Sequence, residues 1–211
     1  TTRLDSIYMR DENRGYSLGD IELDLESNRT KTEVSVNSGD FTLSAKVDTG
    51  LMKTVALLGA AAAEVTRQIE KKNIDMEQVD AYLPDFTIQM NSGQQNTVAR
   101  FLKARNIGFR HLSVTTSVRE GSGFRFTTRI DAPYYAGVRL DSVSLTTWQR
   151  DRSLAYAFNV DGSANEQKGP FHVNVTGNML GNHLRTELKQ KDGQGEVGFN
   201  LGIGVTLEDS V

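Results

Sequence analysis

The chain has 211 residues, with 24 Lys and Arg against 27 Asp and Glu, 19 Gly, 3 Pro and no Cys. This length allows a substantial core, and 37 % hydrophobic with 24 % charged residues excludes both a disordered and a membrane-spanning chain. A net charge of −3 gives no electrostatic footprint for nucleic acid, and the lack of cysteine excludes disulfides, thiolate-bound metals and a cysteine nucleophile. The chain starts at Thr1 with no apolar leader, so we expect a mature chain or, more specifically, a fragment of a longer protein.

The first region, to about residue 47, shows the period-two alternation that predicts strands with one apolar face. A Ser-Gly-Asp triplet at 38–40 separates the last two runs and predicts a hairpin turn. The alternating apolar residues are Ile21, Leu23, Leu25, Val34, Val36, Phe41, Leu43, Ala45 and Val47.

The region from about 48 to 106 changes to a helical period and predicts a helical insert. Its first helix should be capped by Asp48 or Thr49 and closed by Asn73. One apolar stripe runs along this helix at a spacing of three and four residues. The stripe consists of Leu51, Val55, Leu58, Ala62, Val65 and Ile69.

Two shorter helices are expected in the rest of the insert, with a strand at Phe86, Ile88 and Met90 between them. Asp75 followed by Gln78 predicts the start of one helix, which Pro84 would end. Ser92 followed by Gln95 predicts a capping box for the other. The second of these helices should end near Asn106 and present Val98, Phe101 and Leu102 on its inner face.

From residue 107 onward the alternation returns, with turns predicted at 121–123, 161–162, 169–170, 181–182 and 192–193. This rhythm is typical of an up-and-down antiparallel meander. We therefore expect residues 1–211 to form one mainly β segment with a helical insert. Its apolar face must be covered by curling into a trough or by closing as a sandwich or barrel.

The last predicted strand is unusually long and two-faced. Its opposite side carries Gly198, Asn200, Gly202, Gly204 and Thr206. The strand is either a core strand of a sandwich or a wall of an apolar groove, and in the second case six residues are candidate lipid-groove residues. They are Val197, Phe199, Leu201, Ile203, Val205 and Leu207.

Motifs for catalysis are weak. Asp48-Thr49-Gly50 after an apolar strand resembles the loop of aspartic peptidases, but no second such loop exists and a helix is expected to follow. The three histidines, His111, His172 and His183, lack metal-ligand spacing, so we expect no metal, no cofactor and no enzyme activity. A basic cluster could bind a phosphate or lipid headgroup, or be a solvated helix face. It consists of Arg100, Lys103, Arg105 and Arg110.

Several stretches of the chain form a common pattern. They are Tyr16-Ser17-Leu18-Gly19-Asp20-Ile21 with Leu23 and Leu25, the turn Asn37-Ser38-Gly39-Asp40 into Phe41, the helix from Leu51, the Leu83-Pro84 stop, and the ending Gly195-Glu196-Val197-Gly198-Phe199-Asn200-Leu201-Gly202. Together these stretches resemble an internal segment of TamB-like proteins, in particular the long forms of Bacteroidota-type bacteria. The resemblance covers most of the chain.

The resemblance implies a periplasmic chain of the AsmA-like group, anchored in the inner membrane by an N-terminal helix of the full-length protein. It implies an extended curled sheet, a β-taco, with an apolar groove for phospholipid transport. It also implies a role in outer-membrane protein assembly with a barrel partner of the TamA or BamA kind. No catalytic residues carry over, and the helical insert would interrupt a continuous groove. The competing hypothesis is a closed β-sandwich module that binds protein or glycan.

Overall fold

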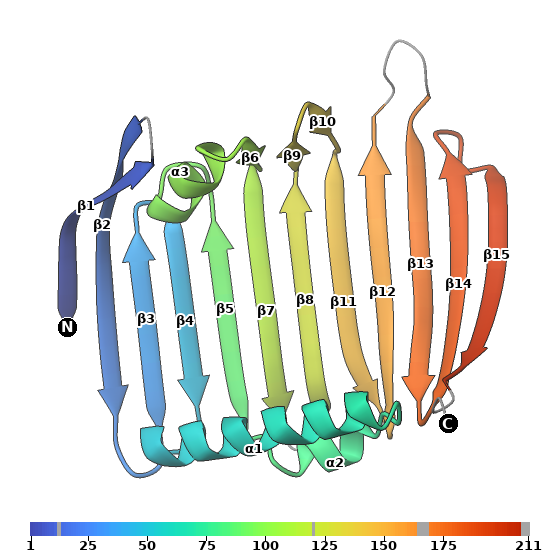
Figure 1. The fold of residues 1–211 in the computed structure, drawn as a ribbon, viewed down its shortest axis with the longest axis horizontal. Coiled ribbons are helices and arrows are strands. Elements are labelled where there is room, and N and C mark those ends of the chain that lie inside the picture. Colours follow the sequence, from blue (N-terminus) through green and yellow to red (C-terminus); the bar gives the residue numbers. More distant parts are fainter. Residues whose placement is uncertain (12–13, 120, 164–168, 208–211) are drawn as a thin grey trace.

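The structure, a computed structural model, describes residues 1–11, 14–119, 121–163 and 169–207. Within residues 6–18 it describes the backbone and not the side chains. It is mainly β, with 58 % strand and 17 % helix, as the sequence predicted. Twelve strands form one antiparallel sheet that is not closed into a barrel (Figure 1). Of the alternatives that the sequence left open, closure as a barrel is wrong, and the other sheet of the described residues has only three short strands.

The large sheet is a meander in which each strand pairs with the next one along the chain. Its strands, in spatial order, are β1 (Thr2–Asp11), β2 (Arg14–Ser27), β3 (Thr32–Ser38), β4 (Phe41–Val47), β5 (Phe86–Ser92), β7 (His111–Arg119), β8 (Gly123–Asp131), β11 (Ser142–Arg150), β12 (Ser153–Gly162), β13 (Phe171–Leu180), β14 (His183–Asp192) and β15 (Val197–Thr206). The small sheet consists of β6 (Ile107–Gly108), β9 (Tyr134–Tyr135) and β10 (Val138–Arg139).

The helical insert leaves the large sheet unbroken. It contains α1 (Leu51–Glu70), α2 (Met76–Asp80) and α3 (Thr97–Lys103). Strand β4 pairs directly with β5, and β5 with β7, so the helices leave the plane of the sheet at the strand ends. Helix α1 crosses the lower ends of the strands and α3 lies at their upper ends (Figure 1). Among the described residues, no helix is long and apolar enough to span a membrane.

The predicted turn at 38–40 is confirmed, and two separate features, its backbone conformation and a close neighbour, require glycine at position 39. Gly39 joins β3 to β4 with a φ of +59°, a conformation that residues with a Cβ rarely adopt. A Cβ at this position would lie 2.0 Å from the carbonyl oxygen of Gln95, in the loop before α3. The close approach places the α3 segment against the upper end of the sheet.

One predicted turn is wrong. The Asp-Gly pair at 161–162 remains in β12, where Gly162 pairs with Phe171 of β13. A Cβ on Gly162 would lie 2.2 Å from the Phe171 ring, so the glycine leaves space for an aromatic side chain in the ladder. Sequence alternation also missed β1 and the small sheet, and Leu207 lies just beyond β15.

The helix ends differ in part from the prediction. The cap of α1 is Gly50, and the first N–H of α1, that of Leu51, donates to Ser27 Oγ, 24 residues away in sequence, at 3.1 Å. The positive φ after α1 belongs to Lys72, at 48°, so the expected closure at Asn73 is wrong.

The predicted cap of α2 is confirmed, because Asp75 accepts a hydrogen bond from the Glu77 N–H. The helix ends at Asp80, before Pro84. Helix α3 is capped by Asn96 and not by Ser92. In both helices a carboxylate or amide close to the first turn satisfies backbone donors that would otherwise lack partners.

Candidate functional site: an uncovered apolar face

Strand pairing aligns one residue from each of the twelve strands into a row, here called the middle apolar row. Ten of the twelve side chains are apolar, and the exceptions are Thr2 and Thr128. In spatial order the row is Thr2, Leu23, Val36, Leu43, Met90, Val114, Thr128, Leu145, Phe158, Val175, Leu188 and Leu201.

The neighbouring row, one residue further along each strand pair, points to the opposite side of the sheet. This middle polar row has no apolar side chain larger than that of Ala157. Its members are Asp24, Ser35, Ser44, Gln89, Thr115, Thr127, Thr146, Ala157, Thr176, Glu187 and Gly202. The sheet therefore has one apolar and one polar face across its full width.

The apolar face has no second layer of described residues over its middle. Every apolar member of the middle apolar row is half-buried or exposed, whereas core residues of a two-layer domain are fully buried. Full burial occurs at the strand ends. At the lower ends, which α1 crosses in Figure 1, Val47 is 8 % and Val118 3 % exposed, and at the upper end of β4 Phe41 is 8 % exposed.

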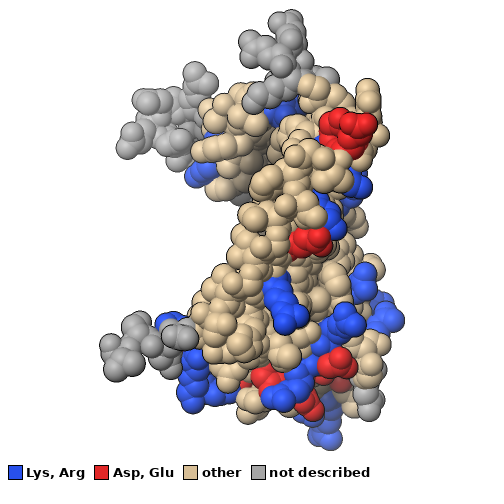
Figure 2. Space-filling model, turned by 90° about the vertical axis from the view of Figure 1, so that its right-hand side faces the viewer, with Lys and Arg blue, Asp and Glu red and all other residues tan. Residues whose placement is uncertain are grey.

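The helices flank the apolar face at its two ends. Ser38, which pairs with Phe41 in the ladder, hydrogen-bonds Thr97 of α3 at 2.7 Å. At the other end of β3, the buried Thr32 donates to the carbonyl of Thr49, just before α1, at 2.9 Å. Seen from the β15 side, the molecule is hollowed at mid-height on its left, where the surface in view is mostly uncharged (Figure 2). Charged side chains gather mainly on the opposite side and at the lower end.

The apolar stripe predicted on α1 is exposed. Val55 is 60 % and Ile69 62 % exposed, whereas the buried positions of the helix are Thr54, Ala61 and Gln68. The buried positions are seven residues apart and lie about 90° around the helix from the stripe. Thr54 and Gln68 can be buried because both are hydrogen-bonded to backbone groups. The stripe therefore adds exposed apolar surface beside the sheet.

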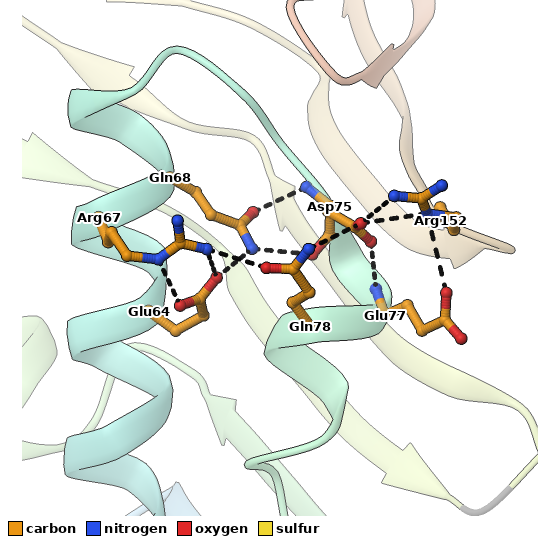
Figure 3. A network of polar contacts seen from close by, with 7 residues as sticks. All are labelled: Glu64, Arg67, Gln68, Asp75, Glu77, Gln78 and Arg152. Atoms are coloured by element: carbon orange, nitrogen blue, oxygen red, sulfur yellow. Dashed lines mark hydrogen bonds and ion pairs between the residues drawn. The ribbon is translucent and has the colours of Figure 1, made fainter.

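A polar network, here called the latch, fixes the C-terminal end of α1 (Figure 3). It consists of Glu64, Arg67, Gln68, Asp75, Glu77, Gln78 and Arg152. Gln68 is 2 % exposed and bonds both backbone groups of Asp75, receiving the N–H at 2.8 Å and donating to the carbonyl at 2.9 Å. The Asp75 carboxylate pairs with Arg152 in the turn between β11 and β12. This hydrogen bond from Arg152 lowers the pKa of Asp75.

Two further residues of the latch, Glu64 and Arg67, lie on α1 beside Gln68. Hydrogen bonds from Arg67 and Gln68 lower the pKa of Glu64 to about 2. Because the folded-state pKa is depressed, the stabilisation from Glu64 is present above its ordinary pKa and is lost as the pH falls towards 2. The latch therefore stays ionised at neutral pH and holds α1 to α2 and to the sheet.

The predicted groove residues of the last strand lie at the open edge of the sheet. Val197, Phe199, Leu201, Ile203 and Val205 are between 39 and 56 % exposed. Leu188 and Leu184, the β14 partners of Leu201 and Val205, extend the same face inward, so the last strand is the margin of a larger surface. The sequence prediction missed the rest of that surface, although the same alternation was its signal in every strand from β2 onward.

The residues of the weaker chemical motifs remain scattered. Helix α1 follows Asp48-Thr49-Gly50 directly, and Asp48 is exposed. The three histidines lie on three strands; for example, His172 contacts Asp161 at 2.5 Å, whereas His183 contacts Thr206. The described residues contain no group of three or more His, Cys, Asp or Glu that could hold a metal ion.

The apolar face can bind apolar chains by hydrophobic contact, without covalent chemistry. Comparisons of the chain with protein families, with curated proteins and with solved structures found no match.

Proposed function

We propose that this chain is a non-enzymatic segment of a TamB-like envelope-biogenesis protein whose apolar face carries phospholipid acyl chains. The middle apolar row supports this proposal most strongly, because it crosses all twelve strands and no layer of described residues covers it. Soluble proteins rarely expose a contiguous apolar surface of this extent unless it binds something. The proposed occupant is an acyl chain, because the middle apolar row contains no charged side chain and offers mainly hydrophobic contact.

The dimensions fit this occupant. Eleven steps between twelve strands, at about 4.8 Å each, give an apolar face about 53 Å wide. One leaflet of a bilayer has a hydrocarbon depth of about 15 Å, so several acyl chains fit one after another. Each buried methylene contributes about 0.8 kcal/mol, which offsets much of the cost of lifting a lipid out of a membrane.

The same face is suited to sliding. Strand follows strand with similar apolar side chains and with short polar interruptions such as Thr128 and Thr186. An acyl chain that moves across the sheet exchanges one contact for an equivalent one, so no position holds it in a deep free-energy minimum. Transport along the sheet then requires no catalytic residue.

The finer parts of the proposal rest on the resemblance. We include a trough-like, β-taco form of the sheet, and the hollow seen in Figure 2 is compatible with it. We also include a periplasmic location, an inner-membrane anchor in the full-length protein and an outer-membrane barrel partner of the TamA or BamA kind. We prefer this proposal to a closed module that binds protein or glycan, because the sheet is not closed into a barrel.

Site-specific photocrosslinking tests the proposal. A photoreactive residue at Leu201 should label phospholipid from vesicles at least about fivefold more strongly than one at Asn200, because only Leu201 lies on the apolar face. The two positions are adjacent in β15 and share the same exposure class, so they form a matched pair. Equal labelling, or labelling mainly from Asn200, would contradict the proposal.

A further inference from the structure

We propose that a basic pocket at the upper end of the apolar face binds a phosphate-bearing anionic group, such as the headgroup of a phospholipid. The inference rests on the proposed function where it names the headgroup, and it extends that function from acyl chains to a charged anchor. The pocket joins part of the predicted basic cluster to a residue that sequence reasoning did not include. Its three cations are Lys103, Arg110 and Arg139.

The cations converge from segments that are distant along the chain. Lys103 ends α3, Arg110 immediately precedes β7, and Arg139 lies in β10 of the small sheet. All three line one cavity of about 830 Å³, which is large enough for a lipid headgroup. In contrast, Arg105 of the predicted cluster is placed over the Phe101 ring, 3.8 Å from its centroid.

The charged side chains that line this pocket are all positive. No Asp or Glu lines it, and the uncharged polar groups around the cations include Gln94, Gln95 and Asn106. No carboxylate of the described residues forms an ion pair with any of the three cations. In a chain of net charge −3, three uncompensated cations around one cavity favour an anion as the ligand.

The pocket continues the apolar face in the direction of the strands. Arg110 and Ala132 line the pocket two residues beyond Leu112 and Ile130, a ladder pair of the apolar face. The nine residues of β7 extend about 30 Å from this pocket towards α1, which exceeds the roughly 15 Å of one leaflet. A phospholipid can therefore place its headgroup in the pocket and its acyl chains on the apolar face.

The test uses two triple variants with the same change in net charge. One removes the pocket cations by Lys103→Gln, Arg110→Gln and Arg139→Gln. The control removes three exposed arginines elsewhere by Arg119→Gln, Arg125→Gln and Arg150→Gln, none of which lines this pocket. Capture of phosphatidylglycerol from vesicles should fall at least about tenfold in the pocket variant and less than about twofold in the control.

A second arm separates the possible sources of the phosphate. Inorganic phosphate titrated into the unmodified chain should shift the NMR signals of Gly108 and Arg110, and the pocket variant should lose this response. Saturation at micromolar phosphate would identify a free anion as the ligand, whereas millimolar saturation with tight phosphatidylglycerol capture would identify a headgroup. Equal losses in both triple variants, or no loss in either together with no phosphate shift, would overturn the pocket.

Failure of the pocket is distinguishable from failure of the proposed function. If the pocket variant captures lipid as well as the unmodified chain, phosphate gives no NMR shift and Leu201 still crosslinks, the pocket is rejected and the proposed function of the apolar face is retained. If the unmodified chain captures no lipid, the proposed function fails, and the phosphate titration still decides the pocket.

Discussion

Leu145→Glu should lower phospholipid capture at least about tenfold, because it puts a carboxylate into the centre of the middle apolar row. Leu145 faces Thr128 of β8 and Phe158 of β12 and has no cation beside it in the ladder. An acyl chain crossing this position would have to desolvate the charge, a cost well above the 1.4 kcal/mol that corresponds to a tenfold loss. Capture of a fluorescent phospholipid from vesicles measures the effect.

The matched control is Thr146→Glu, the next residue of the same strand. Its neighbours across the ladder are Thr127 and Ala157, on the polar face. The variant adds the same charge to the same strand but leaves the apolar face intact, so capture should change by less than about twofold. Similar losses in both variants would indicate a general charge effect and count against the apolar face.

Gln68→Ala should lower the free energy of unfolding by about 2 kcal/mol, the largest stability effect expected of a single residue in the latch. The substitution leaves a buried void and removes both partners of the Asp75 backbone, whose N–H and carbonyl bond the Gln68 side chain. Urea unfolding followed by circular dichroism measures the change. Hydrogen exchange should also become faster in α1, because the latch fixes its C-terminal end.

Arg67→Ala serves as the comparison for the latch. The Arg67 side chain is 43 % exposed, and Glu64, its partner on the same helix, keeps the hydrogen bond from Gln68 when Arg67 is removed, so the loss should be smaller than for Gln68. A large effect of Arg67→Ala with a small effect of Gln68→Ala would show that the exposed ion pair, and not the buried amide, holds α1.

The fold class and most strands follow from period-two alternation, because each strand of this sheet has one apolar and one polar side. The same pattern does not predict whether the sheet closes. Closure depends on the twist of the sheet and on what covers its apolar face. A strand with an uncovered apolar face has the same sequence alternation as a strand with a packed one. For this reason the sequence does not distinguish whether Leu145 or Val175 lies in a packed core or on an exposed surface.

The site was predicted only at its margin, in β15. Register assigns the other members of the middle apolar row, and register depends on hairpins such as the one at Gly39, whose close contact with Gln95 spans 56 residues. For the same reason the latch was missed, and the basic pocket was predicted only in part, through Lys103 and Arg110. Gln68 and Arg152, or Lys103 and Arg139, are brought together by the path of the insert around the strand ends and have no common sequence motif.

The measurement that tests the central claim most directly is methyl NMR with a phospholipid that carries a nitroxide on its acyl chain. Val114 and Val175 lie in the middle apolar row, and Ala157 lies in the middle polar row. The apolar face predicts that the methyl signals of Val114 and Val175 broaden first and most, while that of Ala157 keeps most of its intensity. Equal broadening on both faces, or stronger broadening of Ala157, would contradict acyl-chain binding to the apolar face.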